Sequence, residues 1–274
     1  IVRAGGVLSL KASNNTDGVA GADGSATSKD TTGVTVGAGV ALNVVSSINE
    51  ATIGTGATVN AGGLVLSAEM TDVAGDKVST VGADAKSGAG GGKVGVAGSL
   101  ALSVADIRST ALVKGGATVT LSGTGDVNLS ASNTTLSTVT AQPDGIGAAA
   151  DKVGVGASVA INISNNTTLA QIENGATLTG TLHDVTLVAT SNNGTVTTAK
   201  AGGTAGGGGV GVGGAISLAV ATNITTADIG TGNTLVLGGA LLATATHKGA
   251  TTTIADGTAG GGKAGIGIAL GLNV

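Results

Sequence analysis

One segment, in which large aliphatic residues alternate with small ones, recurs five times along the chain. The copies read "VTVGAGVALNV" from Val34, "VGVAGSLALSV" from Val94, "VGVGASVAINI" from Val153, "VGVGGAISLAV" from Val210 and "AGIGIALGLNV" from Ala264. Successive copies start 60, 59, 57 and 54 residues apart. A hydrophobic period of two is typical of β-strands, and its recurrence at a nearly constant spacing indicates a repeat protein.

Each repeat continues with a short corner and a second strand. The corner reads "GATV" or "GATL", with "GNTL" in the fourth copy, and strands such as "LVLSA" from Leu64 and "DVTLVA" from Asp184 follow it. No segment shows a helical period, and the strands are separated by short polar corners such as "NNT", which includes Asn165 and Asn166, and "GTG". The pattern predicts an all-β chain folded as a parallel β-helix, that is, a β-solenoid. A period near 57 residues favours two unequal coils per repeat, and one broad, flattened coil per repeat is the alternative.

The repeats divide the chain without any sign of a domain boundary. We expect residues 1–274 to form one continuous β-solenoid window, consisting of a partial repeat 1–33, repeats 34–93, 94–152, 153–209 and 210–263, and a partial repeat 264–274. Because both ends fall within a repeat, this predicts a window of a longer array.

The two faces of the repeated strand differ in side-chain size. In the copy from Val210, one face carries Val210, Val212, Ile216, Leu218 and Val220, and the other carries Gly211, Gly213, Ala215, Ser217 and Ala219. Burial of aliphatic side chains is the main favourable term in folding. We therefore expect the aliphatic residues to stack inside the coil, with Val155, Ile161 and Leu187 pointing inward.

The face of small residues has two interpretations. Small residues let the strand bend, or let it pack under another part of its own repeat. Alternatively, they form a stripe on which a second solenoid packs laterally, so that the chain associates with itself into fibres or bundles. The residues of this lateral-packing stripe are Gly154, Gly156, Ser158 and Ala160, with Gly211, Gly213, Ala215 and Ser217 in the next repeat.

Composition supports an elongated fold and argues against several partners. The chain has 52 Gly, no Cys and no aromatic residue, so its core is thin and has no disulfide framework. The net charge of −4 comes from scattered residues and provides no basic stripe for nucleic acid. The charge-free run 201–227 alternates like a strand, and its many glycines would each weaken a helix by about 1 kcal/mol, so we expect no membrane insertion of this segment.

Chemistry-bearing residues are sparse. His183 and His247 are the only histidines, and neither has a second His or a Cys at ligand spacing, so both are expected at the surface or at strand edges. The "GGGK" runs before Val94 and Ala264 lack the spacing of a phosphate-binding loop. We expect no enzymatic activity, no cofactor and no metal site.

The segment "GVGASVAINISNNTTLAQIENGATLTGTLHDVTLVATS", Gly154 to Ser191, resembles the repeat regions of very large bacterial surface proteins. These are the filamentous-haemagglutinin-like and autotransporter-type adhesins, and the resemblance covers essentially the whole chain. It implies a right-handed parallel β-helix, secretion to the bacterial outer surface, and a stalk or fibre that supports adhesion, cell–cell contact or an extracellular matrix. The alternative is a module that binds glycans or a host surface directly, although the chain lacks the Trp and Tyr that such surfaces usually use.

Overall fold

The computed structural model describes residues 1–30, 32–233 and 235–274, and within them the chain forms strands and turns without a helix. The strands are β1 (Val2–Arg3), β2 (Val7–Asn14), β3 (Gly18–Asp23), β4 (Ala26–Thr27), β5 (Val34–Ile53), β6 (Thr58–Ala61), β7 (Gly63–Met70), β8 (Ser79–Gly90), β9 (Val94–Val113), β10 (Thr118–Leu121), β11 (Val127–Ala150), β12 (Val153–Ile172), β13 (Thr177–Gly180), β14 (Val185–Ala205), β15 (Val210–Ile229), β16 (Leu241–Gly260) and β17 (Ala264–Asn273). The prediction of an all-β parallel solenoid is confirmed.

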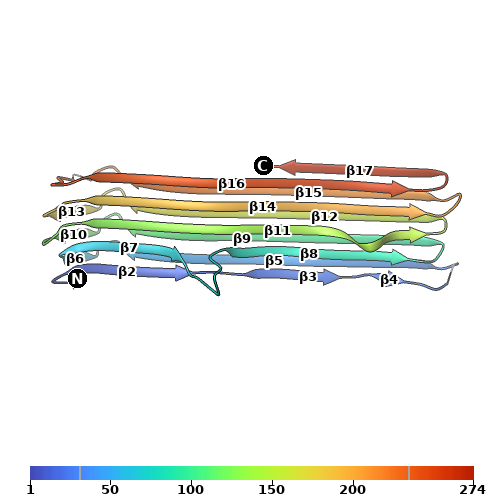
Figure 1. The fold of residues 1–274 in the computed structure, drawn as a ribbon, viewed down its shortest axis with the longest axis horizontal. Coiled ribbons are helices and arrows are strands. Elements are labelled where there is room, and N and C mark those ends of the chain that lie inside the picture. The colour runs from blue at the N-terminus through green and yellow to red at the C-terminus, as the bar shows by residue number, and fades with distance from the viewer. Residues whose placement is uncertain (31, 234) are drawn as a thin grey trace.

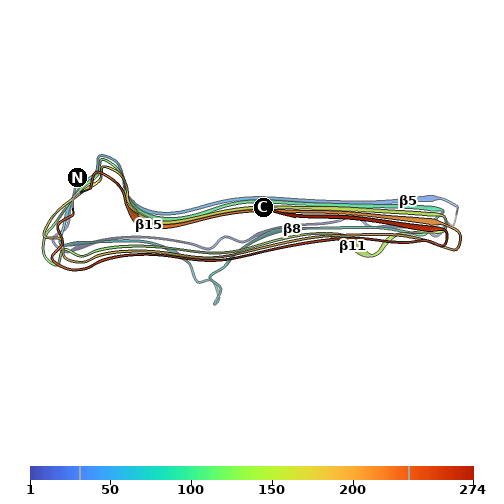
Figure 2. The ribbon, with the colours of Figure 1, turned by 90° about the horizontal axis from the view of Figure 1, so that it is seen from above.

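The strands form three parallel sheets that enclose a flattened coil. The aliphatic sheet, named for its outer face, has the order β17-β15-β12-β9-β5, and the polar sheet has the order β16-β14-β11-β7-β2 with β8, β3 and β4 alongside. A corner sheet, β1-β6-β10-β13, closes one end. Figure 1 shows the coils stacked in chain order, and Figure 2 shows the two broad layers close together along most of their length and separated at one end.

One repeat makes one coil, so the expectation of two coils per repeat was wrong. Val153 pairs with Val94 in the preceding repeat and with Val210 in the following one, and this register holds along all 20 residues of β12. At about 3.3 Å per residue each such strand is roughly 65 Å long. Polar residues that suggested a corner, such as Asn166, lie in the middle of β12 instead.

Glycines with positive φ make the reversals at both ends of the coil. Gly56, Gly116 and Gly175 open the "GAT" corners with φ of 73°, 79° and 74°. The fourth corner includes residue 234, which lies outside the described residues. At the other end, the run Gly206–Gly209 joins β14 to β15, with Gly208 at φ 85° and a hydrogen bond from Gly209 N to Gly206 O of 2.9 Å. L-residues other than Gly rarely adopt this backbone conformation.

The largest aliphatic cluster fills the coil at its wide end. Ladders from the three sheets meet there, and each consists of matched residues from successive coils: Leu66, Leu129 and Leu187; Ile53, Val113 and Ile172; Val59, Val119 and Leu178. Leu187 is fully buried, as predicted. This cluster is a conventional hydrophobic core.

In the narrow half of the coil the two broad layers touch through their backbones. A Cβ built on Gly154 would lie 2.1 Å from Thr204 O, and one on Gly156 would lie 2.3 Å from Gly202 O. Gly213 meets Thr258 O at 2.0 Å in the same way in the next coil. No side chain fits between the layers at these positions, so glycine is required there.

The predicted orientation of the repeated strand was therefore wrong. Its small residues face the interior, and Val155 and Ile161 lie on the outer face. The spacing of the layers leaves no room inside for Val155, and the unbroken alternation of β12 places Ile161 on the same side. The predicted lateral-packing stripe is buried within its own chain: Ser158, Ala160, Ala215 and Ser217 are at most 3% exposed. The other interpretation, that small residues pack under another part of the same repeat, is confirmed.

Between the glycine-lined and aliphatic zones, the interior is polar. Ser137 Oγ donates to Asn162 Oδ1 at 2.6 Å, and Asn162 Nδ2 donates to Ser137 O and Val196 O at 3.2 Å each. Asn166 Nδ2 donates to Asn223 Oδ1 of the next coil at 3.0 Å. Hydrogen bonds thus join the two layers and also join neighbouring coils.

Candidate functional site: two outer faces of opposite character

The aliphatic sheet exposes a continuous face of aliphatic side chains. Over residues 34–44, 94–104, 153–163, 210–220 and 264–274, each outward position carries an aliphatic residue or glycine. We call these positions the aliphatic face. On β12 they are Val153, Val155, Ala157, Val159, Ile161 and Ile163. On the outermost strand β5, Leu42 is 58% and Val44 79% exposed, so these side chains have no cover in the chain.

A shallow groove runs across the strands of the aliphatic face. It arises at Ala157 and Gly214, where the outward residue is small, and Ile268 of β17 lies at its end. The equivalent outward residues on β5 and β9 are also small, namely Ala38 and Gly98. The groove has a volume of about 330 Å³ and is lined by Ala157, Ser158, Val159, Gly214, Ala215, Ile216, Ile268 and Leu270. The groove therefore lies beside a ridge of branched side chains formed by Val40, Leu100, Val159, Ile216 and Leu270.

Charged residues begin where the aliphatic face ends. Further along the same strands, Lys114 Nζ lies 2.8 Å from Glu50 Oε1 and Arg108 Nη2 lies 3.2 Å from Asp106 Oδ2. The hydrogen bonds from Lys114 and from Thr52 lower the pKa of Glu50, and Glu50 in turn raises the pKa of Lys114. The outer surface of the sheet thus has one apolar half and one half of mixed polar and charged residues.

The polar sheet exposes hydroxyl and amide groups in the corresponding positions. Its outward residues include Ser130, Ser132 and Thr134 on β11 and Thr190 and Asn192 on β14. Parallel pairing aligns them from coil to coil at about 4.8 Å. The two broad outer faces of one coil are therefore chemically opposite.

One turn projects from the polar sheet, between β7 and β8 (Figures 1 and 2). Asp72 Oδ1 accepts from Gly75 N at 2.7 Å, and Ala74 and Gly75 have φ of 53° and 88°. Beside the turn lies a groove of about 250 Å³, lined by Glu69, Met70, Lys77, Ser130, Ala131, Ser132, Val188 and Thr190. Sequence reasoning missed this feature, although three charged residues within "TDVAGDKV" are unusual in a chain that is 10% charged.

Glu69 is held at one side of this groove. Ser67 Oγ donates to its Oε1 at 2.7 Å, and Lys11 Nζ lies 3.0 Å from its Oε2. The hydrogen bond from Ser67 and the interaction with Lys11 lower the pKa of Glu69, so it is ionised at neutral pH. Lys77, by contrast, lies on the turn itself.

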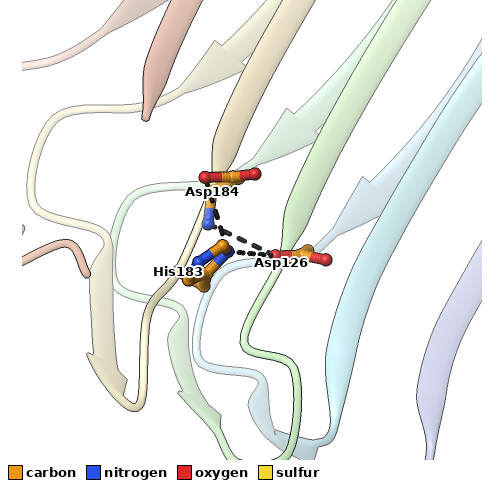
Figure 3. Close-up of side chains that lie close together, drawn as sticks. All are labelled: Asp126, His183 and Asp184. Carbon is orange, nitrogen blue, oxygen red and sulfur yellow. Dashed lines mark hydrogen bonds and ion pairs between the residues drawn. The ribbon is translucent and has the colours of Figure 1, made fainter. Parts of the chain in front are cut away.

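A cluster of three titratable side chains lies at the coil corner, where Asp126, His183 and Asp184 meet (Figure 3). His183 Nδ1 is 3.2 Å from Asp126 Oδ1 and 3.4 Å from Asp184 Oδ1. The same carboxylates accept backbone hydrogen bonds, Asp126 from Asp184 N at 3.3 Å and Asp184 from Ala240 N at 2.7 Å. These bonds fix the entries of β14 and β16 and account for the positions of the carboxylates.

Both histidines lie where the sequence placed them. His183 precedes β14 on the surface, and His247 lies exposed in the edge strand β16, with its Nδ1 2.7 Å from Ser191 Oγ. Sequence spacing alone did not bring Asp126 to His183, because they lie 57 residues apart and the coil period unites them.

Comparisons of the chain with protein-family models, with curated proteins and with solved structures gave no match. Among the described residues, none belongs to a helix with the length and apolar character needed to cross a membrane.

Proposed function

We propose that this chain is a structural segment, a stalk or fibre, of a secreted or cell-surface filamentous protein. The observation that carries the proposal is the uniform register of the repeats: each strand of the aliphatic sheet pairs with the equivalent residues of the next repeat. Every repeat therefore adds one layer of about 4.8 Å, and length follows from repeat number.

The interior supports the same role, because all three of its zones repeat along the solenoid axis. The leucine ladder and the backbone contacts at the glycines each continue from coil to coil, and buried polar side chains occupy matched positions between them, as Asn49, Ser109 and Thr168 do. Contacts in three zones across the width of the coil oppose bending of the solenoid, and resistance to bending is a property that a stalk needs.

The proposed setting is the outer surface of a bacterial cell, where the protein would support adhesion, cell–cell contact or an extracellular matrix. This setting rests on the resemblance of Gly154–Ser191 to the repeats of filamentous-haemagglutinin-like and autotransporter-type adhesins.

Immunogold electron microscopy with antibodies against this chain tests the proposal on cells that produce the parent protein. We expect gold particles outside the cell envelope, along filaments, with unlabelled surfaces on cells in which the gene is deleted. Gold confined to the cell interior would contradict the proposal.

A second candidate function, direct binding of a glycan or host surface, is favoured by the groove beside the projecting turn. The groove combines the Glu69 carboxylate and Lys77 with the hydroxyls of Ser132 and Thr190, which are the hydrogen-bonding groups that a sugar requires.

Glycan-array binding of the isolated chain tests this second function. We expect Lys77→Ala and Thr190→Ala to abolish any signal and Lys200→Ala, on the same face but away from the groove, to leave it unchanged. Absence of binding by the unaltered chain, or equal loss in all three variants, would rule the groove out.

A further inference from the structure

The aliphatic face is too large and too apolar to be an ordinary solvent-exposed surface. It spans eleven residues along five strands, that is, roughly 33 Å by 24 Å, or about 800 Å². Monomeric proteins rarely expose a continuous apolar patch of this size, whereas a specific interface buries about 800 Å² on each partner. The chain has a polar alternative, since the polar sheet presents Ser, Thr and Asn to solvent.

We propose that a second copy of this chain covers the aliphatic face, with the two sheets packed face to face. This inference goes beyond the proposed function and does not depend on it. The outward positions carry no charge on either copy, so pairing the face with itself buries no unpaired ionised group. The charged residues Glu50, Asp106 and Arg108 would remain outside the contact.

The ridge and the groove of the aliphatic face are complementary to the groove and the ridge of a second copy. Counting from the first residue of each strand, the aliphatic face extends over positions 1 to 11, the groove lies at position 5 and the ridge at position 7. A two-fold axis parallel to the solenoid axis at position 6 passes through the centre of the face. It places the ridge residue Val159 of one copy in the groove at Ala157 of the other, and the reverse.

This symmetry has two consequences. Val155 at position 3 of one copy faces Ile161 at position 9 of the other within the same coil. The two solenoid axes also run in the same direction, so the pairing extends along any number of coils. Sheets packed face to face lie about 10 Å apart, which leaves room for interdigitated aliphatic side chains.

Sedimentation equilibrium of the chain, with matched lysine substitutions, tests the pairing. We expect the chain to form dimers at micromolar concentration. The double variant Val159→Lys with Ile216→Lys should raise the dissociation constant by about 100-fold or more, because it buries unpaired charges between the copies. The control Val188→Lys with Thr190→Lys, on the polar sheet, should leave it unchanged, and circular dichroism should be the same for all three.

A cross-linking experiment tests the symmetry. Because the chain has no native cysteine, only the introduced cysteines can react. A mixture of Val155→Cys and Ile161→Cys chains should give a cross-linked pair with a bismaleimide of about 10 Å. Either variant alone should give little product.

Several results would overturn the proposal. One is a chain that stays monomeric at about 100 µM, which is well above the micromolar range expected of such an interface. Another is an equal rise in the dissociation constant for the polar-sheet control. The third is cross-linking of Val155→Cys to itself as readily as to Ile161→Cys. Co-sedimentation of the unaltered chain with phosphatidylcholine vesicles, lost in the lysine variant, would assign the face to lipid and also overturn it.

Discussion

A Cβ added to Gly154 would lie 2.1 Å from the carbonyl oxygen of Thr204 in the opposite layer. This distance is below any van der Waals contact, so a side chain at Gly154 would push β12 and β14 apart. The two layers depend on glycine for their spacing, and this spacing in turn decides which residues the interior can hold.

Gly154→Ala should destabilise the fold for this reason, by about 1 to 3 kcal/mol, as overpacking of an interior usually does. Gly214→Ala is the matched control, because its Cβ would point outward with no atom within 4 Å. Urea denaturation of both variants measures the difference. Equal stabilities would show that the layers are not in contact at Gly154.

Asn162→Ala should cost about 1 to 3 kcal/mol, because it removes the buried hydrogen bonds that join Asn162 to the Ser137 hydroxyl and to the Ser137 and Val196 carbonyl groups. Asn165→Ala removes the same side chain from an outward position of the same strand and should change stability by less than about 0.5 kcal/mol. Thermal unfolding distinguishes the two, and similar melting temperatures for both variants would contradict a hydrogen-bonded interior.

Leu187→Asp should prevent folding of the local coils, because it places a carboxylate in the fully buried leucine ladder. Ile161→Asp should leave the coil folded, since Ile161 lies on the outer face. Circular dichroism of the two variants tests this contrast. Loss of β-structure in the Ile161 variant would restore the inward orientation that the sequence had suggested.

Deletion of residues 94–152 should yield a folded chain with one coil fewer. The deletion joins Lys93 to Val153, and because Val153 occupies the position of Val94 one coil later, β12 can pair with β5 in unchanged register. Deletion of residues 94–123 is the control, since it destroys the register. Proteolytic resistance of the first variant and digestion of the second is the expected result, and digestion of both would contradict coil-by-coil modularity.

The Glu50–Lys114 pair should make a small, pH-dependent contribution to stability. The pKa of Glu50 is lowered in the folded chain, so its contribution is present above the unfolded value of about 4.3 and is lost as the pH falls through the lower folded value. Glu50→Gln should therefore lower the melting temperature slightly at about pH 7 and have no effect at about pH 2. An equal decrease at both values would point to lost packing instead of lost charge.

The sequence by itself determined the repeat, the strand content and the parallel stacking. The recurrence from Val34 to Ala264 needed no tertiary information, because pairing of equivalent residues is what aligns a solenoid. The Gly of each "GAT" corner was equally readable, since a positive φ is a local requirement.

The orientation of the repeated strand could also be derived from the sequence, but only by following the alternation of inward and outward residues along the whole of β12. Ala170 and Ile172 alternate in step with Gly154, Ala160 and Asn162, so all five must share a face once β12 is known to run 20 residues without a break. When the polar Asn165–Asn166 pair is interpreted as a corner, the alternation before the pair can no longer be related to the alternation after it. With the strand cut in two, the hydrophobic effect alone assigned the aliphatic residues to the interior.

Only the tertiary structure decided the distance between the two layers, and that distance reversed the usual placement of residues. Where the backbones touch, as at Gly156 and Gly202, the interior has no volume for Val155, and alternation along β12 then turns Ile161 outward as well. The grouping of Asp126 with His183, and of Ser137 with Asn162, likewise followed from coil geometry. Local sequence specifies which residues alternate, but the side that is buried depends on how closely the opposing layer approaches.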